Sequence, residues 1–196
     1  MSGIQQESTD SSEAAERILG AAQKLFYRDG IRAVGMDAIK EEASVALATL
    51  YKHFSSKDEL VEAYLRRRDE RWRRWLEGSV ENIEDPRERL LAIFDALGAW
   101  FGCEDFRGCA FINAAGEIGT DKGRAGRLAG EHKRAVRKFL GRLVADARLP
   151  EPEKIVGQLM VLVEGAIVTA YVEGDYGAAR RAKEMAEVLL RQVTVH

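Results

Sequence analysis

Signals that start and stop helices recur along this chain, and they constrain its fold more than any other feature. Ser56-Lys57-Asp58-Glu59 is a capping box, and Asp85-Pro86-Arg87-Glu88 repeats its logic with proline at the first helical position. Between such signals apolar residues recur at helical spacing, while alternation of apolar and polar residues is scarce. Only three prolines are present. We therefore predict an all-α fold of about nine helices.

The helices and their connections follow from these signals. Residues 1–12 are polar and rich in Ser and Thr, so we expect a flexible N-terminal arm. Ser12 is a plausible N-cap for the first helix. The helices are expected over residues 12–29, 36–43, 47–53, 57–79, 86–102, 107–118, 124–147, 152–173 and 176–194.

Composition limits the classes of partner. The net charge is −2 with 32% charged residues, so any nucleic-acid site must be a local patch. Two cysteines give no disulfide framework, and no signal peptide is visible, which favours the cytoplasm. Residues 155–172 are about long enough to span a bilayer, but Gln158 and Glu164 interrupt them. We therefore expect a buried helix and no membrane partner.

The two short helices joined by a tight turn, residues 36–54, have the form of a helix-turn-helix. In that motif the second short helix enters the major groove of DNA. Leu47, Leu50 and Phe54 would hold this helix to the core, together with Val45 in the turn.

The opposite face of residues 47–53 then points outward. Thr49 can contact a base and Lys52 a guanine edge or a phosphate, while Ala48 offers apolar contact to a thymine methyl group. Tyr51 and His53, on the flanks, suit phosphate contact, although both can instead pack under the following helix. Lys57, together with the N-terminus of the helix that begins after Ser55-Ser56, adds positive potential.

Residues 13–60 resemble the TetR family of bacterial transcriptional repressors. The resemblance lies in AAQKLFYRDG, in MDAIKEEASV and above all in TLYKHFSSKDEL. The family pattern Thr-Leu-Tyr-x-x-Phe-x-x-Lys-x-x-Leu is filled by Thr49, Leu50, Tyr51, Phe54, Lys57 and Leu60. It implies a DNA-binding domain at 13–60, with its helix-turn-helix at about 35–54, and a ligand-binding and dimerisation domain at 61–196.

Three departures from the family pattern concern DNA contacts. Val34-Gly35 stands where the family commonly has a capping Thr or Ser, and the turn reads Ala43-Ser44-Val45-Ala46-Leu47-Ala48 in place of Ala-Gly-Val-Ser-x-Gly. Lys40 stands where alanine is usual and is a candidate phosphate contact. The candidate DNA-binding residues are thus Lys40, Ala48, Thr49, Tyr51, Lys52, His53 and Lys57.

The resemblance also implies a dimeric repressor that binds a palindromic operator and is released by a small molecule. Apolar helices 152–173 and 176–194 would form a four-helix interface with their copies, the alternative being an ordinary monomer core. Ligand binding would tilt helix 57–79 and lower DNA affinity. The candidate ligand-binding residues, whose types equally suit a core, are Trp72, Trp75, Phe94, Trp100, Phe111, Asn113 and His132.

Cys109 has two interpretations. The segment Arg107–Asn113 resembles the one in TetR-type regulators that sense electrophiles or oxidants through one cysteine, and Arg107 would lower the pKa of the thiol. The alternative is a buried cysteine acting as a small apolar side chain.

Other classes of protein fit the sequence less well. It contains no P-loop, G-x-G-x-x-G or H-E-x-x-H motif, and its three histidines are scattered, so we expect no enzyme, catalytic residue, cofactor or metal site. The arginines of residues 66–74 are interleaved with acids and suit a solvated helix face. A helical adaptor with its partner surface at 152–196 would leave the 49–60 pattern unexplained.

Overall fold

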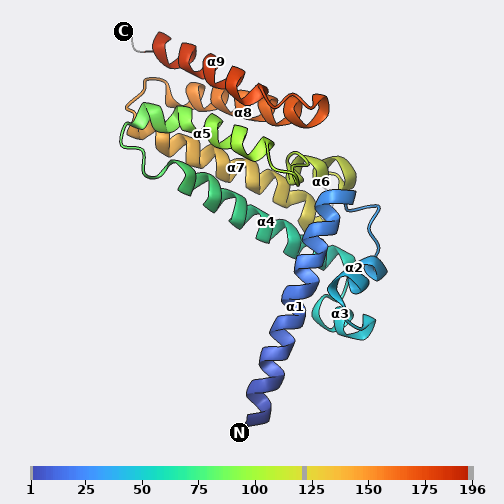
Figure 1. The fold of residues 1–196 in the computed structure, drawn as a ribbon. Coiled ribbons are helices and arrows are strands. Elements are labelled where there is room, and N and C mark those ends of the chain that lie inside the picture. The colour runs from blue at the N-terminus through green and yellow to red at the C-terminus, as the bar shows by residue number, and fades with distance from the viewer. Residues whose placement is uncertain (1, 121–122, 194–196) are drawn as a thin grey trace. The chain divides into compact units, whose positions relative to one another are not determined.

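The computed structural model describes residues 2–120 and 123–193, which form helices and no strand (Figure 1). This confirms the predicted all-α fold. The helices are α1 (Ser2–Asp29), α2 (Met36–Ala43), α3 (Leu47–His53), α4 (Lys57–Val80), α5 (Pro86–Phe101), α6 (Ala110–Ile118), α7 (Gly123–Asp146), α8 (Pro152–Glu173) and α9 (Ala178–Gln192).

Three helices differ by more than one residue from the bounds expected for them. Helix α1 begins at Ser2, so residues 2–12, expected as a flexible arm, continue the helix, in a segment without proline. Helix α6 begins at Ala110 because Gly108 adopts a left-handed backbone (φ 72°) that a helix cannot include. Helix α9 ends at Gln192; Met1 of the expected arm and the expected helix end at residue 194 lie outside the described residues.

The chain divides into two compact units. The first consists of Met1–Asp69 and Ala110–Ala129, and the second of Glu70–Cys109 and Gly130–His196. The first unit therefore combines the N-terminal helices with α6 and the beginning of α7. The expected domain boundary at residues 60 and 61 falls inside this unit.

In the first unit, α2 and α3 pack against α1 (Figure 1). Ile18, Ile39 and Leu50 have no exposed surface and form the centre of this packing. The rings of Phe26 and Tyr64 lie 5.5 Å apart, which joins α1 to α4. Burial of such side chains, each contributing about 2 kcal/mol, fixes the short helices α2 and α3, which are too short to be stable alone.

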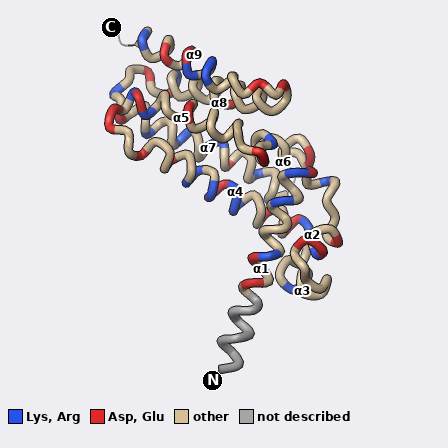
Figure 2. The backbone as a smooth tube through the Cα atoms, in the orientation of Figure 1, with Lys and Arg blue, Asp and Glu red and all other residues tan. Residues whose placement is uncertain are grey.

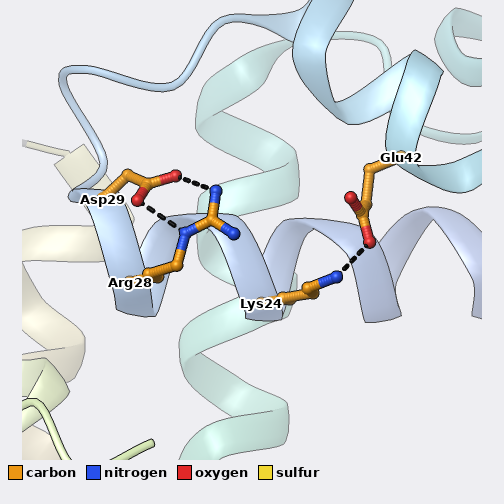
Figure 3. A network of polar contacts seen from close by, with 4 residues as sticks. All are labelled: Lys24, Arg28, Asp29 and Glu42. Carbon is orange, nitrogen blue, oxygen red and sulfur yellow. Dashed lines mark hydrogen bonds and ion pairs between the residues drawn. The ribbon is translucent and has the colours of Figure 1, made fainter.

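Ion pairs on the surface of α1 add to this packing. Figure 3 shows Lys24 Nζ on α1 reaching the carboxylate of Glu42 on α2, at 2.6 Å. Beside it, Arg28 donates two hydrogen bonds to Asp29, the next residue, at 2.7 and 2.6 Å. These exposed pairs contribute little stability, but the Lys24–Glu42 pair neutralises an acid on α2.

In the second unit, α5 packs against α8 and α9, and α8 packs against α9. Phe94, Leu97 and Phe101 of α5 are at most 1% exposed. Small side chains on α9 permit close approach: a Cβ at Gly98 would lie 3.5 Å from the Cβ of Ala179. The predicted start of α5 is confirmed, because Asp85 accepts hydrogen bonds from the backbone N–H groups of Arg87 and Glu88.

Among the described residues, α8 is the one helix that is long and apolar enough to cross a membrane. Within its apolar window, 44% of the residues are buried by the rest of the protein. Helix α8 packs against α5 and α9, and its buried residues include Leu159, Val163, Ile167 and Ala170. We interpret α8 as a helix of the protein interior with one uncovered face.

Candidate functional site

The turn between α2 and α3 is closed by backbone hydrogen bonds. The N–H of Ser44 donates to Glu41 O and that of Val45 to Lys40 O, each at 3.1 Å. Ser44 takes a left-handed conformation, φ 51° and ψ 51°, which costs a non-glycine residue about 1 kcal/mol. A residue other than glycine therefore stands where the turn geometry favours glycine.

Helix α3 is anchored through its middle. Leu50 is fully buried, and the backbone N–H of Phe54 donates to Leu50 O at 2.9 Å. Phe54 and Val45 are half-buried. The expectation that Leu47 is also an anchor is wrong, since its side chain is 41% exposed. Leu47 opens a helix of seven residues, so it lies at the edge of the contact that Leu50 makes.

The outer face of α3 carries most of the candidate DNA-binding residues. Ala48, Tyr51 and Lys52 are exposed, whereas Thr49 and His53 are half-buried. No residue of α3 is acidic. The exposed face thus combines a phenol, an ammonium group and a methyl group with no carboxylate to repel phosphate.

The acids of the neighbouring α2 are largely paired. Lys40 lies 3.6 Å from the Asp37 carboxylate, and Lys24 neutralises Glu42. Lys40 is 30% exposed, so this candidate phosphate contact remains accessible. The helix N-terminus of α2 has no side-chain cap, because Gly35 precedes it.

Hydrogen bonds among Ser55, Ser56 and Glu59 hold the connection between α3 and α4. Ser56 Oγ accepts a hydrogen bond from the N–H of Glu59 at 3.2 Å, as the capping box predicts. The Glu59 carboxylate accepts from the Ser55 hydroxyl at 2.6 Å and from the Ser55 N–H at 2.8 Å. These hydrogen bonds, chiefly that from the Ser55 side chain, lower the pKa of Glu59 below its ordinary 4.5. Lys57 follows as the first residue of α4.

The arginine-rich stretch of α4 (Figure 2) has partners inside the first unit. Arg66 donates to Glu62, Arg67 lies 2.8 Å from Glu16, and the guanidinium of Arg68 lies 4.0 Å from the ring centroid of Tyr27. These contacts agree with the expectation of a surface helix face.

A cavity of about 660 Å³ lies in the first unit, between the start of α4 and the end of α6. Lys57, Glu59 and Glu62 contribute to its wall from α4. Next to it, Glu117 of α6 accepts a hydrogen bond from the Arg32 N–H at 2.7 Å, and a Cβ at Gly30 would lie 3.2 Å from the same carboxylate. This long-range contact has no local signal in the sequence.

The candidate ligand-binding residues do not all lie together. Trp72 and Trp75 of α4, Trp100 of α5 and His132 of α7 form one aromatic cluster, in which the Trp72–His132 centroid distance is 5.2 Å. Phe94, 1% exposed, lies in the core of the second unit. Phe111 and Asn113 belong to the first unit.

Phe106 extends this aromatic cluster and was not predicted as part of it. Its ring lies 5.0 Å from that of Trp100 and 6.2 and 6.3 Å from those of Tyr171 and Tyr176. Gly108 permits this arrangement, because a Cβ there would approach the Tyr171 ring to 2.8 Å. Gly102 and Gly108, on either side of Phe106, are the sequence signal for a tight connection.

Cys109 is buried, with 7% exposure, and lies just before α6. Lys133 Nζ is 3.4 Å from its Sγ and also bonds the Glu164 carboxylate at 2.6 Å. Arg107, expected as the cation beside the thiol, donates to the carbonyls of Glu104 and Phe106. Lys133 is therefore a cation beside the thiol that sequence spacing does not indicate.

Residues 2–120 and 123–193 contain no group of three or more His, Cys, Asp or Glu side chains arranged to hold a metal ion.

Comparison with known proteins identifies the helix-turn-helix region. The family model for "Bacterial regulatory proteins, tetR family" matches residues 18–64, from the middle of α1 into α4. An uncharacterized HTH-type transcriptional regulator of Mycobacterium tuberculosis is 36% identical over 98 residues, which cover 45% of this chain and 48% of that regulator. The chain thus matches about half the length of this relative.

Other relatives match over nearly the whole length. The HTH-type transcriptional regulator YjdC of Escherichia coli is 26% identical over 180 residues, covering 90% of this chain and 93% of YjdC. The crystal structure of a TetR-family transcriptional regulator from Streptomyces coelicolor is 31% identical, with a TM-score of 0.85, over 93% of this chain and 96% of that one. The helices, the helix-turn-helix and these relatives together show that the chain belongs to the TetR family and is a DNA-binding transcriptional regulator rather than an enzyme.

Proposed function

We propose that this regulator is a cytoplasmic homodimer that represses transcription by binding a palindromic operator, and that a small molecule releases it. The DNA contacts are assigned to Lys40, Ala48, Thr49, Tyr51, Lys52, His53 and Lys57. The observation that carries this proposal is the outer face of α3, which exposes Tyr51 and Lys52 and contains no acid.

Different residues have different tasks in the proposed complex. Ala48, exposed, and Thr49, half-buried, lie toward the start of α3, the part of a recognition helix that meets base edges. Lys52 reaches a base edge or a phosphate, and Tyr51, His53, Lys40 and Lys57 contact phosphates. The N-terminus of α4 adds the positive end of its helix dipole beside Lys57.

The proposed dimer interface is the uncovered face of α8 and α9. On α8, Val161, Val168 and Val172 are 71%, 43% and 73% exposed, and Gly165 lies on the same face. On α9, Met185 and Val188 are 60% and 46% exposed. Isolated apolar residues are common on surfaces, but a continuous helical stripe of this kind favours burial by a partner. A second copy of the chain supplies the same stripe and satisfies the two-fold symmetry of a palindrome.

The proposed effector site is the aromatic cluster of the second unit. It combines large apolar rings with few polar groups, as small-molecule sites do. Effector binding there lowers operator affinity because the ligand binds one conformation of the protein better than the other.

The experiment that tests DNA recognition is operator selection from random duplexes with the purified full-length protein. The expected result is enrichment of an inverted repeat whose half-sites are about one helical turn apart. Tyr51→Ala and Lys52→Ala should weaken binding to the selected duplex in a gel-shift assay. The control is Lys138→Ala, which replaces an exposed lysine of α7 and should leave binding unchanged. Recovery of no enriched sequence would contradict operator binding.

A further inference from the structure

The three tryptophans of this chain form one group, which we call the tryptophan triad: Trp72, Trp75 and Trp100. Their ring centroids are 6.1 Å (Trp72–Trp75), 5.7 Å (Trp72–Trp100) and 6.2 Å (Trp75–Trp100) apart. The rings are inclined at 54°, 66° and 57°, so none is stacked flat on another. Tilted and edge-on pairs are the geometries that aromatic rings prefer, so a further aromatic ring can join the group in the same way.

The triad is more exposed to solvent than the core beside it. Trp75 is 37% exposed, and Trp72 and Trp100 are half-buried, whereas the core rings Phe94 and Phe101 are at most 1% exposed. An exposed indole leaves a large apolar area in water, and burying that area would contribute about 25 cal/mol for each Å². The triad therefore presents apolar ring surface that an occupant can cover.

One polar atom in the triad lacks a partner. Trp72 Nε1 is buried and has no hydrogen-bond acceptor, although the rest of its ring contacts Trp75, Trp100 and His132. A buried donor left unpaired costs about 1–3 kcal/mol. Phenylalanine at this position would supply an aromatic face without that cost, so the N–H is a chemically specific feature of the site.

We propose that the tryptophan triad binds a planar aromatic molecule that carries a hydrogen-bond acceptor, and that Trp72 Nε1 donates to this acceptor. The inference rests on the proposed ligand-responsive function and names the chemical class of its effector. The ring of the occupant lies against Trp75 and Trp100, and its carbonyl, carboxylate or ether oxygen meets the indole N–H. Aromatic faces also attract cations, but the positive end of the N–H dipole favours an acceptor over a cation.

Three probes of similar size test the class. Acetylnaphthalene has a planar ring and a carbonyl acceptor, isopropylnaphthalene has the same shape without an acceptor, and N-methylquinolinium is a cation. Binding to the full-length protein is measured by calorimetry, and tryptophan fluorescence locates it, because every tryptophan belongs to the triad. One hydrogen bond should make acetylnaphthalene bind about 3- to 10-fold more tightly than isopropylnaphthalene.

Trp72→Phe keeps an aromatic ring but removes the N–H, so it should bind acetylnaphthalene and isopropylnaphthalene equally. Trp75→Phe is the matched control on the same helix and should retain the preference for the ketone. If Trp72→Phe does not fold, as judged by circular dichroism, benzothienylalanine at position 72 makes the same test, since it keeps the bicyclic shape and lacks the N–H.

The outcomes separate this inference from the proposed function. An unchanged preference in the N–H-free variant, tighter binding of the quinolinium, or no binding of any probe would each overturn the inference. Operator binding, measured on the same preparation, is independent of these results. A protein that selects an operator but ignores the probes is still a DNA-binding regulator, whereas one that selects no operator fails the proposed function.

Discussion

Ser44 holds the turn of the helix-turn-helix in a left-handed conformation (φ 51°) that glycine adopts without strain. Ser44→Gly should therefore raise the free energy of unfolding by about 1 kcal/mol, which corresponds to an increase of about 2–4 °C in Tm for a chain of this size. Thermal denaturation followed by circular dichroism measures this change.

The matched control for this substitution is Glu41→Gly, three residues earlier on the exposed side of α2. Glycine inside a helix should lower stability by about 1 kcal/mol. A loss of stability in both variants would show that the serine hydroxyl, and not backbone strain, dominates at position 44.

The stability of the connection between α3 and α4 depends on pH through Glu59. Its pKa is lowered, first by the Ser55 hydroxyl and then by the Ser55 N–H, so the folded state binds this proton more weakly than the unfolded state. Its contribution to stability is therefore complete above the ordinary value of 4.5 and is lost as pH falls through the lowered pKa. A carboxyl NMR titration should show the Glu59 pKa below 4.5, and Ser55→Ala should return it toward that value. An identical titration in both proteins would contradict this assignment.

The two cysteines differ in access to solvent. Cys103 is exposed, whereas Cys109 is buried beside Lys133. A water-soluble disulfide reagent should modify one thiol per chain quickly in the native protein, and Cys103→Ser should abolish that fast phase. Fast modification of Cys109 in the Cys103→Ser variant would instead support the electrophile-sensing alternative.

At the scale of single elements, α3 and the start of α4 act as the proposed DNA-contacting surface. If Lys52 and Lys57 each neutralise a phosphate, replacing either by alanine should weaken operator binding and lower the slope of log affinity against log salt by about 1. Fluorescence anisotropy at several salt concentrations measures both quantities.

Lys138→Ala is the control for these substitutions, since Lys138 is an exposed lysine of α7 in the other unit. It changes the net charge equally and should leave the slope unchanged. A lysine whose removal weakens binding at constant slope contacts a base and not a phosphate.

Local signals account for how well the elements could be predicted. The Asp85 cap, the Ser56–Glu59 capping box and Pro152 each mark a helix start within the sequence of that helix. The beginning of α1 was missed because a polar segment without apolar periodicity gives no sign of its conformation. The spacing of apolar residues places Leu47 in the core, but spacing does not tell at which residue a short helix leaves its contact with the core.

Contacts between distant residues could not be predicted from the sequence. Glu117 and Arg32 are separated by 85 positions, and Lys133 reaches Glu164 across 31. No periodicity or motif connects such pairs, because only the tertiary fold brings them together. For the same reason the sequence does not show that the candidate ligand-binding residues divide between the units, with Trp72, Trp75, Trp100 and His132 in one and Phe111 and Asn113 in the other.

At the scale of the whole molecule, dimerisation and operator binding should fail together. Val161→Glu with Val172→Glu places two carboxylates in the proposed interface, at positions that are 71% and 73% exposed in the single chain, so the fold should tolerate them. Light scattering after size exclusion should give twice the chain mass of 21.8 kDa for the natural protein and a single chain mass for the variant. Operator affinity should fall because a single chain contacts only one of the two half-sites.

Asn82→Glu, at an exposed turn after α4, adds a charge outside the proposed interface and should leave both measurements unchanged. If the double variant remains dimeric, α8 does not form the interface. If the natural protein is a monomer, the proposal of a dimer is wrong.

The first unit draws residues 110–129 back to the N-terminal helices, and Glu117 bonds the Arg32 backbone there. An excised fragment ending at residue 69 would therefore lack part of its own packing. The same holds for chimeric regulators, in which the DNA-reading half of one protein is joined to the sensor of another. A graft taken from this chain has to be discontinuous, carrying α6 and the first residues of α7 along with α1 to α3 and the first half of α4.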